Sequence, residues 1–280
     1  MRCVSPFVKK DSPHAFPCGK CIPCLKRRVS NWSFRLMKEA EVSTSAFFLT
    51  LTYEKTPITK NGFMTLDKTD VQKFMKRLRK SGQKNIKYYA VGEYGGDTMR
   101  PHYHIIILNL DLELFVGKQI NNQIKLGNIP LDGRVYMWPN TWPQGYVTIG
   151  TCTIASVGYT LKYVTKDKVI PIHKRDDREK EFSLMSKGMG LSYVTDEMIK
   201  WHRNDLKGRM YIPLKDGKKI SMPRYYKKHF YSESEREQIN NYLENKEVME
   251  YQKLSEKEIR KKEEIRIASG AQKIKRNESL

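Results

Sequence analysis

The sequence predicts an α+β fold with an antiparallel sheet, and three observations support this. Several short segments alternate apolar and polar residues with the period of two that strands have, most clearly residues 102–110. Other segments, such as residues 67–80, repeat apolar residues at helical spacing. Between residues 86–93 and 102–110, a Gly95-Gly96-Asp97 turn predicts a β-hairpin. Strands and helices are therefore interleaved along the chain.

The predicted elements follow one another in the order β-α-β-β-α-β-α, preceded by a basic helix. In chain order they are a helix at 26–42, a strand at 46–53, a helix at 67–80, strands at 86–93 and 102–110, a weak helix at 111–125, a strand at 146–150 and a helix at 153–167. This order suits a split βαβ, ferredoxin-like sheet with helices on one face.

The charge of the chain points to a polyanionic partner. Lysine and arginine number 52 against 31 aspartate and glutamate residues, a formal net charge of +21. Such an excess favours nucleic acid, although a basic surface can also serve solubility alone. The longest apolar runs, at 46–51 and 105–108, are too short to span a bilayer, and no signal peptide precedes Cys3. We therefore expect a soluble intracellular protein without a membrane partner.

Composition divides the chain into three parts. Residues 1–30 are Cys-rich, residues 31–231 hold most of the strand and helix patterns, and residues 232–280 predict a charged helical tail. We find no Gly-rich phosphate loop followed by Lys-Ser/Thr, so we expect neither a nucleotide cofactor nor a fused helicase.

The cysteines of the first part have the spacing of metal ligands. Cys18, Cys21 and Cys24 form a Cys-x-x-Cys-x-x-Cys run, and Cys3 can supply a fourth thiolate. Structural zinc takes four such ligands and stabilises small, loop-rich segments. Consecutive Cys-x-x-Cys pairs rarely all reach one ion without strain, so an iron–sulfur cluster and merely reduced thiols are alternatives. Cys152 stands alone and is interpreted as a small buried hydrophobe.

A second set of candidate ligands lies on the predicted hairpin. His102 and His104 are two residues apart in a strand, so both imidazoles project from one face. If the hairpin folds about residues 97–98, Glu93 lies opposite His102 on the neighbouring strand. The three side chains predict a divalent metal site, with manganese favoured by affinity and magnesium expected in a cell. The alternatives are an exposed histidine pair and a carboxylate that merely flanks the turn.

Two tyrosines lie on the polar side of the helix predicted at 153–167. The apolar stripe of this helix consists of Ile154, Val157, Leu161 and Val164. Tyr159 and Tyr163 project together from the opposite side, with Lys162 and Lys166 beside them. Tyrosines at helical spacing usually serve packing, but packing tyrosines belong on the apolar stripe. We therefore interpret this pair as functional.

In this order, the motifs resemble those of the HUH endonucleases that start rolling-circle replication, in the two-tyrosine form. His102-Tyr103-His104 matches His-hydrophobe-His, Tyr159 and Tyr163 match Tyr-x-x-x-Tyr, and residues 47–53 look like the first motif of that superfamily. A closer similarity, to the replication initiators of the Microviridae of the gokushovirus type, rests on Gly92-Glu93-Tyr94-Gly95, Arg100-Pro101-His102-Tyr103-His104, residues 183–188 and Pro223-Arg224-Tyr225-Tyr226. The resemblance extends to about residue 231 and implies an HUH palm with a family-specific extension.

The resemblance implies a replication initiator that nicks single-stranded or melted origin DNA. One of the two tyrosines would attack the phosphate, leaving a 5′-phosphotyrosyl link and a free 3′-hydroxyl, and the stored ester would later rejoin the strand. Lys162 would steady the phosphate charge, or else is a solvated helix lysine. The implied partners are a host polymerase and a host helicase, in the cytoplasm of the bacterial host.

Residues 224–231 interleave cations with aromatic rings, a mixture that binds single-stranded DNA. The expected DNA contacts are Arg224, Tyr225, Tyr226, Lys227 and Lys228, together with Lys166 of the tyrosine helix. Aromatic and basic residues also gather where a strand packs under a helix, which is the structural alternative. Trp138 and Trp142 are expected to be core or loop anchors.

Two other functions stay open from the sequence. A non-catalytic DNA-binding initiator or repressor would explain the charge and the aromatic segment, but it leaves the paired tyrosines without a purpose. A mobilisation relaxase or a transposase with the same chemistry would differ only in its DNA partner.

Overall fold

The computed structural model describes most of the chain. The described residues are 3–10, 15–116, 135–137, 139–162, 170–214 and 217–252, followed by the single residues 255, 258, 260, 264 and 268. Over these residues, every helix is too short or too polar to cross a bilayer.

The chain packs into two units. The sheet unit consists of Arg35–Gly190, and the helical unit joins Met1–Phe34 to Leu191–Ser279. Helix α1, Ile22–Ala40, contributes residues to both units and begins earlier than the helix predicted at 26–42. The limits of the units follow packing and differ from the three parts predicted from composition, which stay a prediction.

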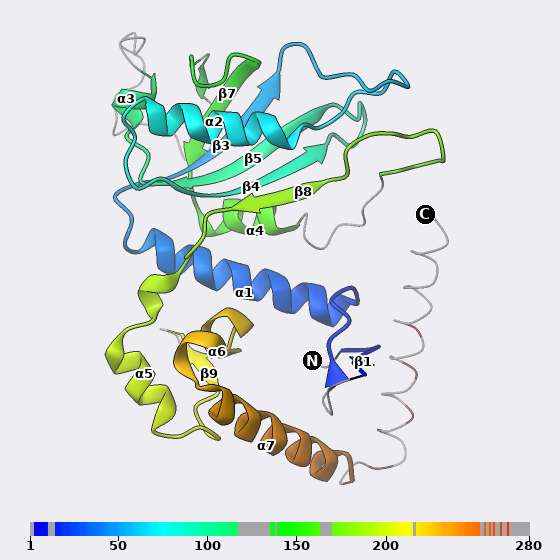
Figure 1. The fold of residues 1–280 in the computed structure, drawn as a ribbon, viewed down its shortest axis with the longest axis vertical. Helices are drawn as coiled ribbons and strands as arrows, with labels where there is room; N and C mark the ends of the chain where they lie inside the picture. Colours follow the sequence, from blue (N-terminus) through cyan, green and yellow to red (C-terminus); the bar gives the residue numbers. More distant parts are fainter. Residues whose placement is uncertain are drawn as a thin grey trace. The chain divides into compact units, whose positions relative to one another are not determined.

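Among the described residues, six strands form the central sheet of the sheet unit (Figure 1). They are β3 (Ala46–Tyr53), β4 (Lys87–Tyr94), β5 (Pro101–Leu108), β6 (Val135–Met137), β7 (Gly145–Thr151) and β8 (Phe182–Met185). Their order across the sheet is β6-β7-β3-β5-β4-β8, and every neighbouring pair is antiparallel. Because β5 lies between β3 and β4, the helix that joins them makes a split βαβ. The predicted α+β fold with an antiparallel, ferredoxin-like sheet is confirmed.

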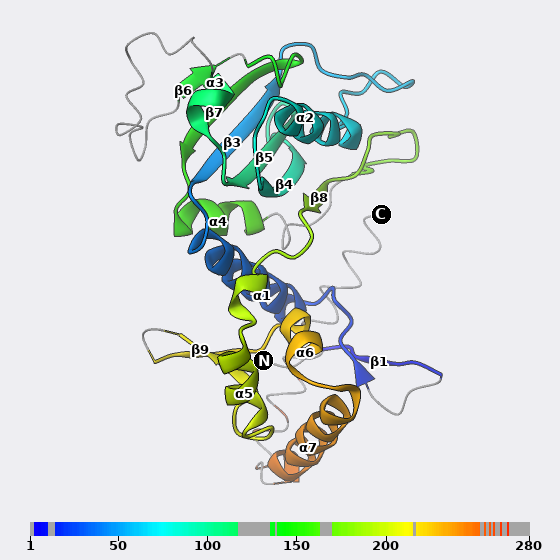
Figure 2. The same cartoon turned by 60° about the vertical axis from the view of Figure 1, so that its left-hand side comes forward.

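Helices cover both faces of this sheet (Figure 1, Figure 2). Helices α2 (Lys68–Lys80) and α3 (Leu112–Val116) pack on the face that carries Tyr103, Ile105 and Ile107. Helix α4 (Ile154–Lys162) lies against β5 from the other face, where Tyr159 meets His104. The prediction of helices on one face holds for α2 and α3, which connect strands of the sheet. It does not hold for α4, because a helix that follows the last central strand is not bound by the handedness of a crossover.

The core of the sheet unit lies between the sheet and α2. Helix α2 begins after Asp67, whose carboxylate accepts a hydrogen bond from the Thr69 N–H at 2.7 Å. The buried apolar residues of α2 are Val71, Phe74, Met75 and Leu78. They pack with the inward-facing residues of β3, β5 and β7, as the period of two in these strands requires.

Tyr103, the residue between the two histidines, anchors β5 to this core. Its hydroxyl lies 2.6 Å from that of Tyr53 and donates to the Asp67 carbonyl at 2.9 Å. The Tyr53 hydroxyl donates to the Asp70 carboxylate at 2.8 Å. Both tyrosines are fully buried, and burial raises the pKa of each hydroxyl. With Tyr103 held in the core, the pleat of β5 turns His102 and His104 to the opposite face.

The predicted element limits agree best within the sheet. Strand β3 has the predicted limits, and the β4–β5 hairpin is confirmed, with the Gly95 N–H donating to the Arg100 carbonyl at 3.0 Å. The helix predicted at 111–125 is described as far as Val116, and the helix predicted at 153–167 as far as Lys162. The remainder of each lies outside the described residues.

The helical unit combines short helices with two small antiparallel sheets. Its elements are β1 (Phe7–Val8), β2 (Ala15–Phe16), the first part of α1, a 3₁₀ turn (Leu191–Tyr193), α5 (Asp196–Arg203), β9 (Tyr211–Pro213), β10 (Lys219–Ser221), α6 (Arg224–Phe230) and α7 (Glu233–Gln252). Its core residues are Phe34, Ile212, Met222, Tyr226, Phe230, Tyr231 and Ile239. Helix α7 begins where the charged helical tail was predicted to begin.

Candidate active site

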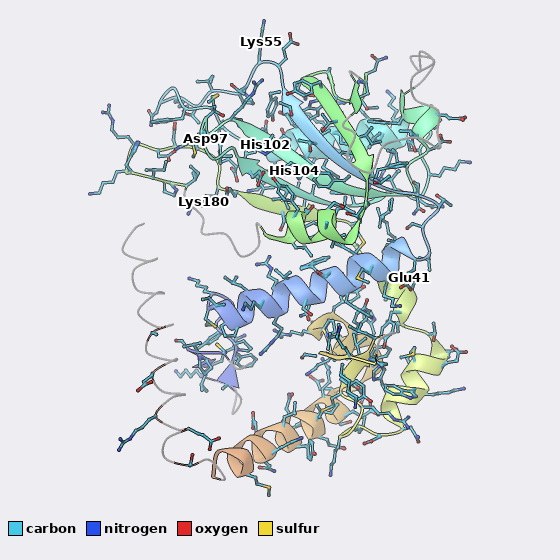
Figure 3. The ribbon with its side chains drawn as sticks, turned by 180° about the vertical axis from the view of Figure 1, so that it is seen from behind. Glu41, Lys55, Asp97, His102, His104 and Lys180 are labelled. Atoms are coloured by element: carbon cyan, nitrogen blue, oxygen red, sulfur yellow. The ribbon has the colours of Figure 1, made fainter. Side chains whose placement is uncertain are left out.

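Three predicted metal ligands come together on β4 and β5. In the antiparallel register Glu93 pairs with His102, and the next residue of β5 on that face is His104. Glu93 Oε1 lies 2.7 Å from His102 Nε2 and 2.9 Å from His104 Nε2. Glu93 and His104 are buried, whereas His102 keeps 20% of its side chain exposed. Figure 3 shows both histidines side by side on the sheet, so the site is rooted in the sheet and opens past His102.

Hydrogen bonds behind the rings determine how the imidazoles are presented. His102 Nδ1 lies 3.1 Å from the carbonyl oxygen of Arg100, which can only accept, so Nδ1 carries the proton. In a neutral His102 the lone pair of Nε2 then faces the lone pairs of Glu93 Oε1 at 2.7 Å. Either an imidazolium or a cation between the two atoms removes this repulsion. Two imidazole nitrogens and one carboxylate oxygen are a donor set that divalent metals accept, so the residues fit the predicted ion.

Strand β3 supplies two further side chains to the site, neither of which the sequence analysis named. Thr50 pairs with His104 in the β3–β5 register, and its Oγ1 lies 3.0 Å from His104 Nδ1. Phe48 stacks on the His104 ring with centroids 5.3 Å apart. Both lie in the run 47–53 at positions of the same parity, so the alternation of that strand was the signal that could have found them.

Tyr159 lies beside the histidines. Its ring centroid is 5.2 Å from that of His104 and 6.3 Å from that of Phe48, both in edge-on arrangements. The side chain is 45% exposed, so the ring contacts the site while solvent still reaches the residue. The prediction that this tyrosine lies on the polar side of its helix is confirmed, because Val157 and Leu161 are buried.

A reciprocal capping arrangement starts α4 at the correct place. The Ser156 N–H donates to Thr153 Oγ1 at 3.2 Å, and the Thr153 N–H donates to Ser156 Oγ at 2.7 Å. From this start, one and a half turns carry the helix to Tyr159. The side chain of Lys162, and all of Tyr163 and Lys166, lie outside the described residues.

The predicted cysteine ligands form a second group, in the helical unit. The sulfurs of Cys3, Cys18, Cys21 and Cys24 all lie within 4.8 Å of one another, and none forms a disulfide. Burial tends to raise the pKa of Cys18, but hydrogen bonds from the backbone N–H groups of Lys20 and Cys21 outweigh it and lower that pKa to about 6.

Cys152 and Trp142 belong to the packed structure. Cys152 is half-buried next to Ser156 Oγ at 3.8 Å, and burial raises the pKa of its thiol. Trp142 is buried and donates from Nε1 to the Thr52 carbonyl at 3.2 Å, as expected for a core anchor. Trp138 lies outside the described residues.

The predicted DNA contacts of residues 224–228 divide into exposed and buried positions on α6. Arg224 and Lys228 are exposed, and Tyr225 and Lys227 are half-buried. Burial lowers the pKa of Lys227, and the nearby positive charges of Arg27 and Arg224 lower it further. Tyr226 has no exposed surface and packs against Phe34. It therefore cannot stack on a DNA base, and the prediction for this one residue was wrong because its side of α6 faces the core.

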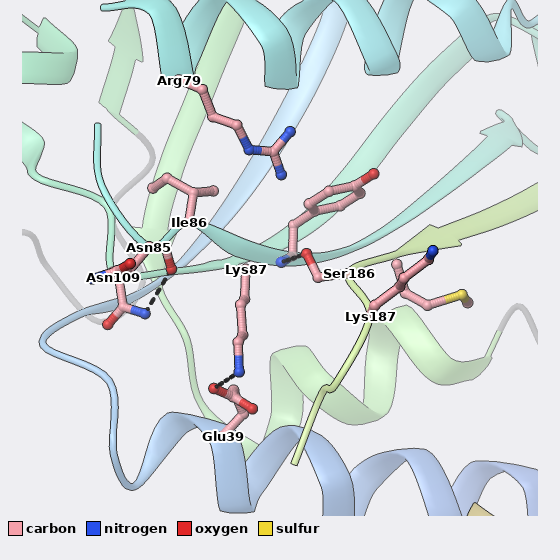
Figure 4. Close-up of a pocket in the computed structure, with 10 residues that line it drawn as sticks. Glu39, Arg79, Asn85, Ile86, Lys87, Asn109, Ser186 and Lys187 are labelled. Carbon is pink, nitrogen blue, oxygen red and sulfur yellow. Dashed lines mark hydrogen bonds and ion pairs between the residues drawn. The ribbon is translucent and has the colours of Figure 1, made fainter. Parts of the chain in front are cut away.

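A separate pocket of about 640 Å³ lies at the other end of β4 (Figure 4). Its lining includes the cations of Arg79, Lys87 and Lys187. Lys87 pairs with the buried carboxylate of Glu39 at 2.6 Å, which ties the last turn of α1 to the sheet. Lys87 is six residues before Glu93 on the same strand, about 20 Å away at 3.3 Å per residue. The pocket is therefore not part of the histidine site.

The segment that carries the site matches a known family. Residues 46–168, which include Glu93, both histidines and both tyrosines, match a family model described as replication-associated protein of the ORF2 type. The replication-associated protein ORF2 of Spiroplasma virus 4 is 30% identical over 256 residues, covering 86% of this chain and 74% of that protein. The chain belongs to this family of replication-associated proteins.

Other family members come from further small phages. The replication-associated protein VP4 of Bdellovibrio phage phiMH2K is 25% identical over 257 residues, covering 87% of this chain and 78% of that protein. For the replication-associated protein ORF4 of Chlamydia phage 1 the values are 27% over 231 residues, 78% and 54%. No solved structure matches the chain. The predicted resemblance to Microviridae-type replication proteins is confirmed.

Proposed function

We propose that this family member is a replication initiation endonuclease of the HUH type. It nicks single-stranded or melted origin DNA by tyrosine attack and later rejoins the strand. The observation that carries the proposal is the position of Tyr159, a half-exposed phenol in edge contact with one imidazole of a His-His-Glu cluster. A cluster with only a structural role would not need a tyrosine from a separate helix beside it.

His102, His104 and Glu93 would hold a divalent ion, magnesium or manganese, through Nε2, Nε2 and Oε1. When bound, the ion polarises the scissile phosphate and stabilises the charge that develops on it. Thr50 and the Arg100 carbonyl orient the two rings through their Nδ1 atoms. Phe48 covers one face of His104 and keeps water from that side.

Tyr159 supplies the nucleophile. Its phenolic oxygen attacks phosphorus and forms a new P–O bond, the phenolic proton passes to solvent, and the bond to the 3′ oxygen breaks. The products are a 5′-phosphotyrosyl link and a 3′-hydroxyl, which takes up a proton. One phosphodiester replaces another, so the reverse attack by a 3′-hydroxyl rejoins the strand without a nucleotide cofactor.

Tyr163, four residues after Tyr159, would be the second nucleophile. Residues four apart share a face of an α-helix, so a second cleavage can begin while the first tyrosine still carries the 5′ end. Lys162 and Lys166 from the same segment would contact phosphates near the cut.

DNA would be held by the excess of positive charge and by the exposed side of α6. Arg224, Lys227 and Lys228 are suited to phosphates, and the half-exposed ring of Tyr225 to an unpaired base. The free 3′-hydroxyl would prime a host polymerase after a host helicase has separated the strands. The protein would therefore act in the cytoplasm of the bacterial host.

The test is covalent capture of DNA. The protein is incubated with end-labelled single-stranded phage genome and Mn²⁺, and adducts that survive SDS are separated on a gel. We expect an adduct with the natural sequence and with Tyr146→Phe, because Tyr146 faces the same side of the sheet, on β7, but two strands away from His102.

The tyrosine variants then identify the nucleophiles. Tyr159→Phe and Tyr163→Phe should each retain some single cleavage but fail in repeated strand transfer, since that needs one tyrosine free. The double variant should give no adduct. An adduct from the double variant would show that another group attacks, and DNA binding without any adduct would favour a non-catalytic initiator or repressor.

A further inference from the structure

We propose that Cys3, Cys18, Cys21 and Cys24 form a structural zinc site that fixes the N-terminal hairpin to the start of α1. This site is separate from the His-His-Glu cluster and does not depend on the proposed nicking activity. The sequence alone left zinc, an iron–sulfur cluster and reduced thiols open, and the arrangement of the four sulfurs decides among them.

The distances between the sulfurs fit a single ion. Zinc binds thiolate sulfur at about 2.3 Å, so two ligands of a tetrahedral site lie about 3.8 Å apart. The sulfurs of Cys3 and Cys21 are 3.8 Å apart, and all four lie within 4.8 Å of one another. A disulfide would require about 2.05 Å. A cluster of several irons would spread its cysteines over different metal atoms, farther apart than the ligands of one ion.

Three local structures bring the cysteines together. In the hairpin Phe7 pairs with Phe16, so the strands lead Cys3 and Cys18 to the same end. Gly19 then turns the chain with a φ of +74°, a conformation that side chains other than glycine rarely adopt. Cys21 lies just before α1, where its carbonyl accepts a hydrogen bond from the Leu25 N–H at 3.0 Å.

The start of α1 also removes the strain expected of a Cys-x-x-Cys-x-x-Cys run. Cys21 and Cys24 are three residues apart across the first helical turn, so their sulfurs project from the same side. Only the Cys18–Cys21 pair then needs a tight loop, which Gly19 provides. Three consecutive cysteines of this spacing can therefore reach one ion.

The surroundings suit thiolates. The Cys18 N–H points to Cys3 Sγ at 3.2 Å, and the Cys21 N–H to Cys18 Sγ at 3.4 Å. Backbone donors of this kind orient metal-bound thiolates and offset their charge. The N-terminus of α1, a helix of 19 residues, contributes a further partial positive charge. A zinc ion with four thiolates would carry a net charge of −2, and this stretch is rich in lysine and arginine.

The hairpin needs such a fastening. Its strands β1 and β2 have two residues each, and the side chains of Phe7 and Val8 are 49% and 66% exposed. Two-stranded hairpins of this size are marginal by themselves in water. Burial of Cys21 and Cys24 gives the segment a centre made of sulfur instead of a hydrocarbon core, and a metal ion supplies the missing stability.

The first measurement is the metal content of the full chain, purified without chelators and analysed for zinc and iron. We expect about one zinc per chain, retained in Cys152→Ser and in the His102→Ala, His104→Ala double variant, and lost in Cys18→Ser with Cys21→Ser. Iron instead of zinc, no metal, or zinc retained by the Cys18, Cys21 variant would each overturn the proposal.

The second measurement does not require that the cysteine variant folds. Zinc in the natural sequence is replaced by Co²⁺, whose visible absorption distinguishes a tetrahedral tetrathiolate from sites with nitrogen or oxygen ligands. The spectrum of a tetrathiolate is expected, and a spectrum with fewer sulfurs would contradict the assignment. Neither measurement uses DNA cleavage, so failure of the proposed endonuclease function would leave both results intact.

Discussion

The two groups of candidate metal ligands stand on very different supports. Glu93, His102 and His104 project from neighbouring strands of a sheet with its own large core, and Tyr103 locks their strand to that core through its hydroxyl. The four cysteines lie in a segment with two-residue strands and exposed apolar side chains. A sheet of this kind forms without metal, whereas the hairpin gains its stability from the ligands themselves.

The difference teaches what each metal would be for. A preformed cluster of nitrogen and oxygen ligands with an opening leaves room for a substrate, which is what catalysis requires. A closed set of four thiolates offers no such position and serves folding. The two groups should therefore respond differently to the same treatments, and three predictions, with the two experiments already described, sharpen this contrast.

The largest expected effect is on cleavage. His102→Ala with His104→Ala, or removal of divalent ions with EDTA, should lower nicking by roughly 10³-fold or more, because the phosphate loses its electrostatic stabilisation in the transition state. Affinity for single-stranded DNA, measured by anisotropy, should change little, since the basic surface supplies it. Nicking at the full rate in metal-free protein would break the comparison at its first term.

A smaller effect is expected one contact away from the ligands. Thr50→Val removes the hydroxyl that holds His104 Nδ1 and should raise the Mn²⁺ concentration needed for half-maximal nicking about 10- to 100-fold. Thr148→Val is the matched control, because Thr148 pairs with Thr50 across β3 and β7 and is one strand farther from His104. Equal shifts in both variants would show that the Thr50 hydroxyl does not position the ring.

The smallest effect tests the support of the sheet site. Tyr103→Phe leaves the ring in the core but removes the hydroxyl that meets Tyr53 and Asp67, and should lower the free energy of unfolding by roughly 1–3 kcal/mol in urea titrations. Zinc content should not change, because the cysteine group lies in the other unit. Loss of zinc together with the sheet would show that the two sites do not fold independently.

Much of the candidate site could be predicted from short-range patterns. A period of two placed both histidines on one face, and the short turn after Glu93 fixed the register that brings this carboxylate to His102. A period near 3.6 placed Tyr159 opposite the stripe of Val157 and Leu161. The same composition that suggested DNA contact at Tyr226 misled, because an amphipathic segment rich in aromatic rings does not say which ring the core will cover.

By itself, then, the sequence determined which side chains share a face of each strand or helix, because backbone geometry and hydrogen bonding within an element set those periods. Only the tertiary structure decided which faces meet. It placed α4 on the face opposite α2, brought Phe48 and Thr50 to His104, and joined Cys3 to the three later cysteines. Such contacts depend on burial of apolar surface between segments far apart in the chain, and no local pattern records that choice.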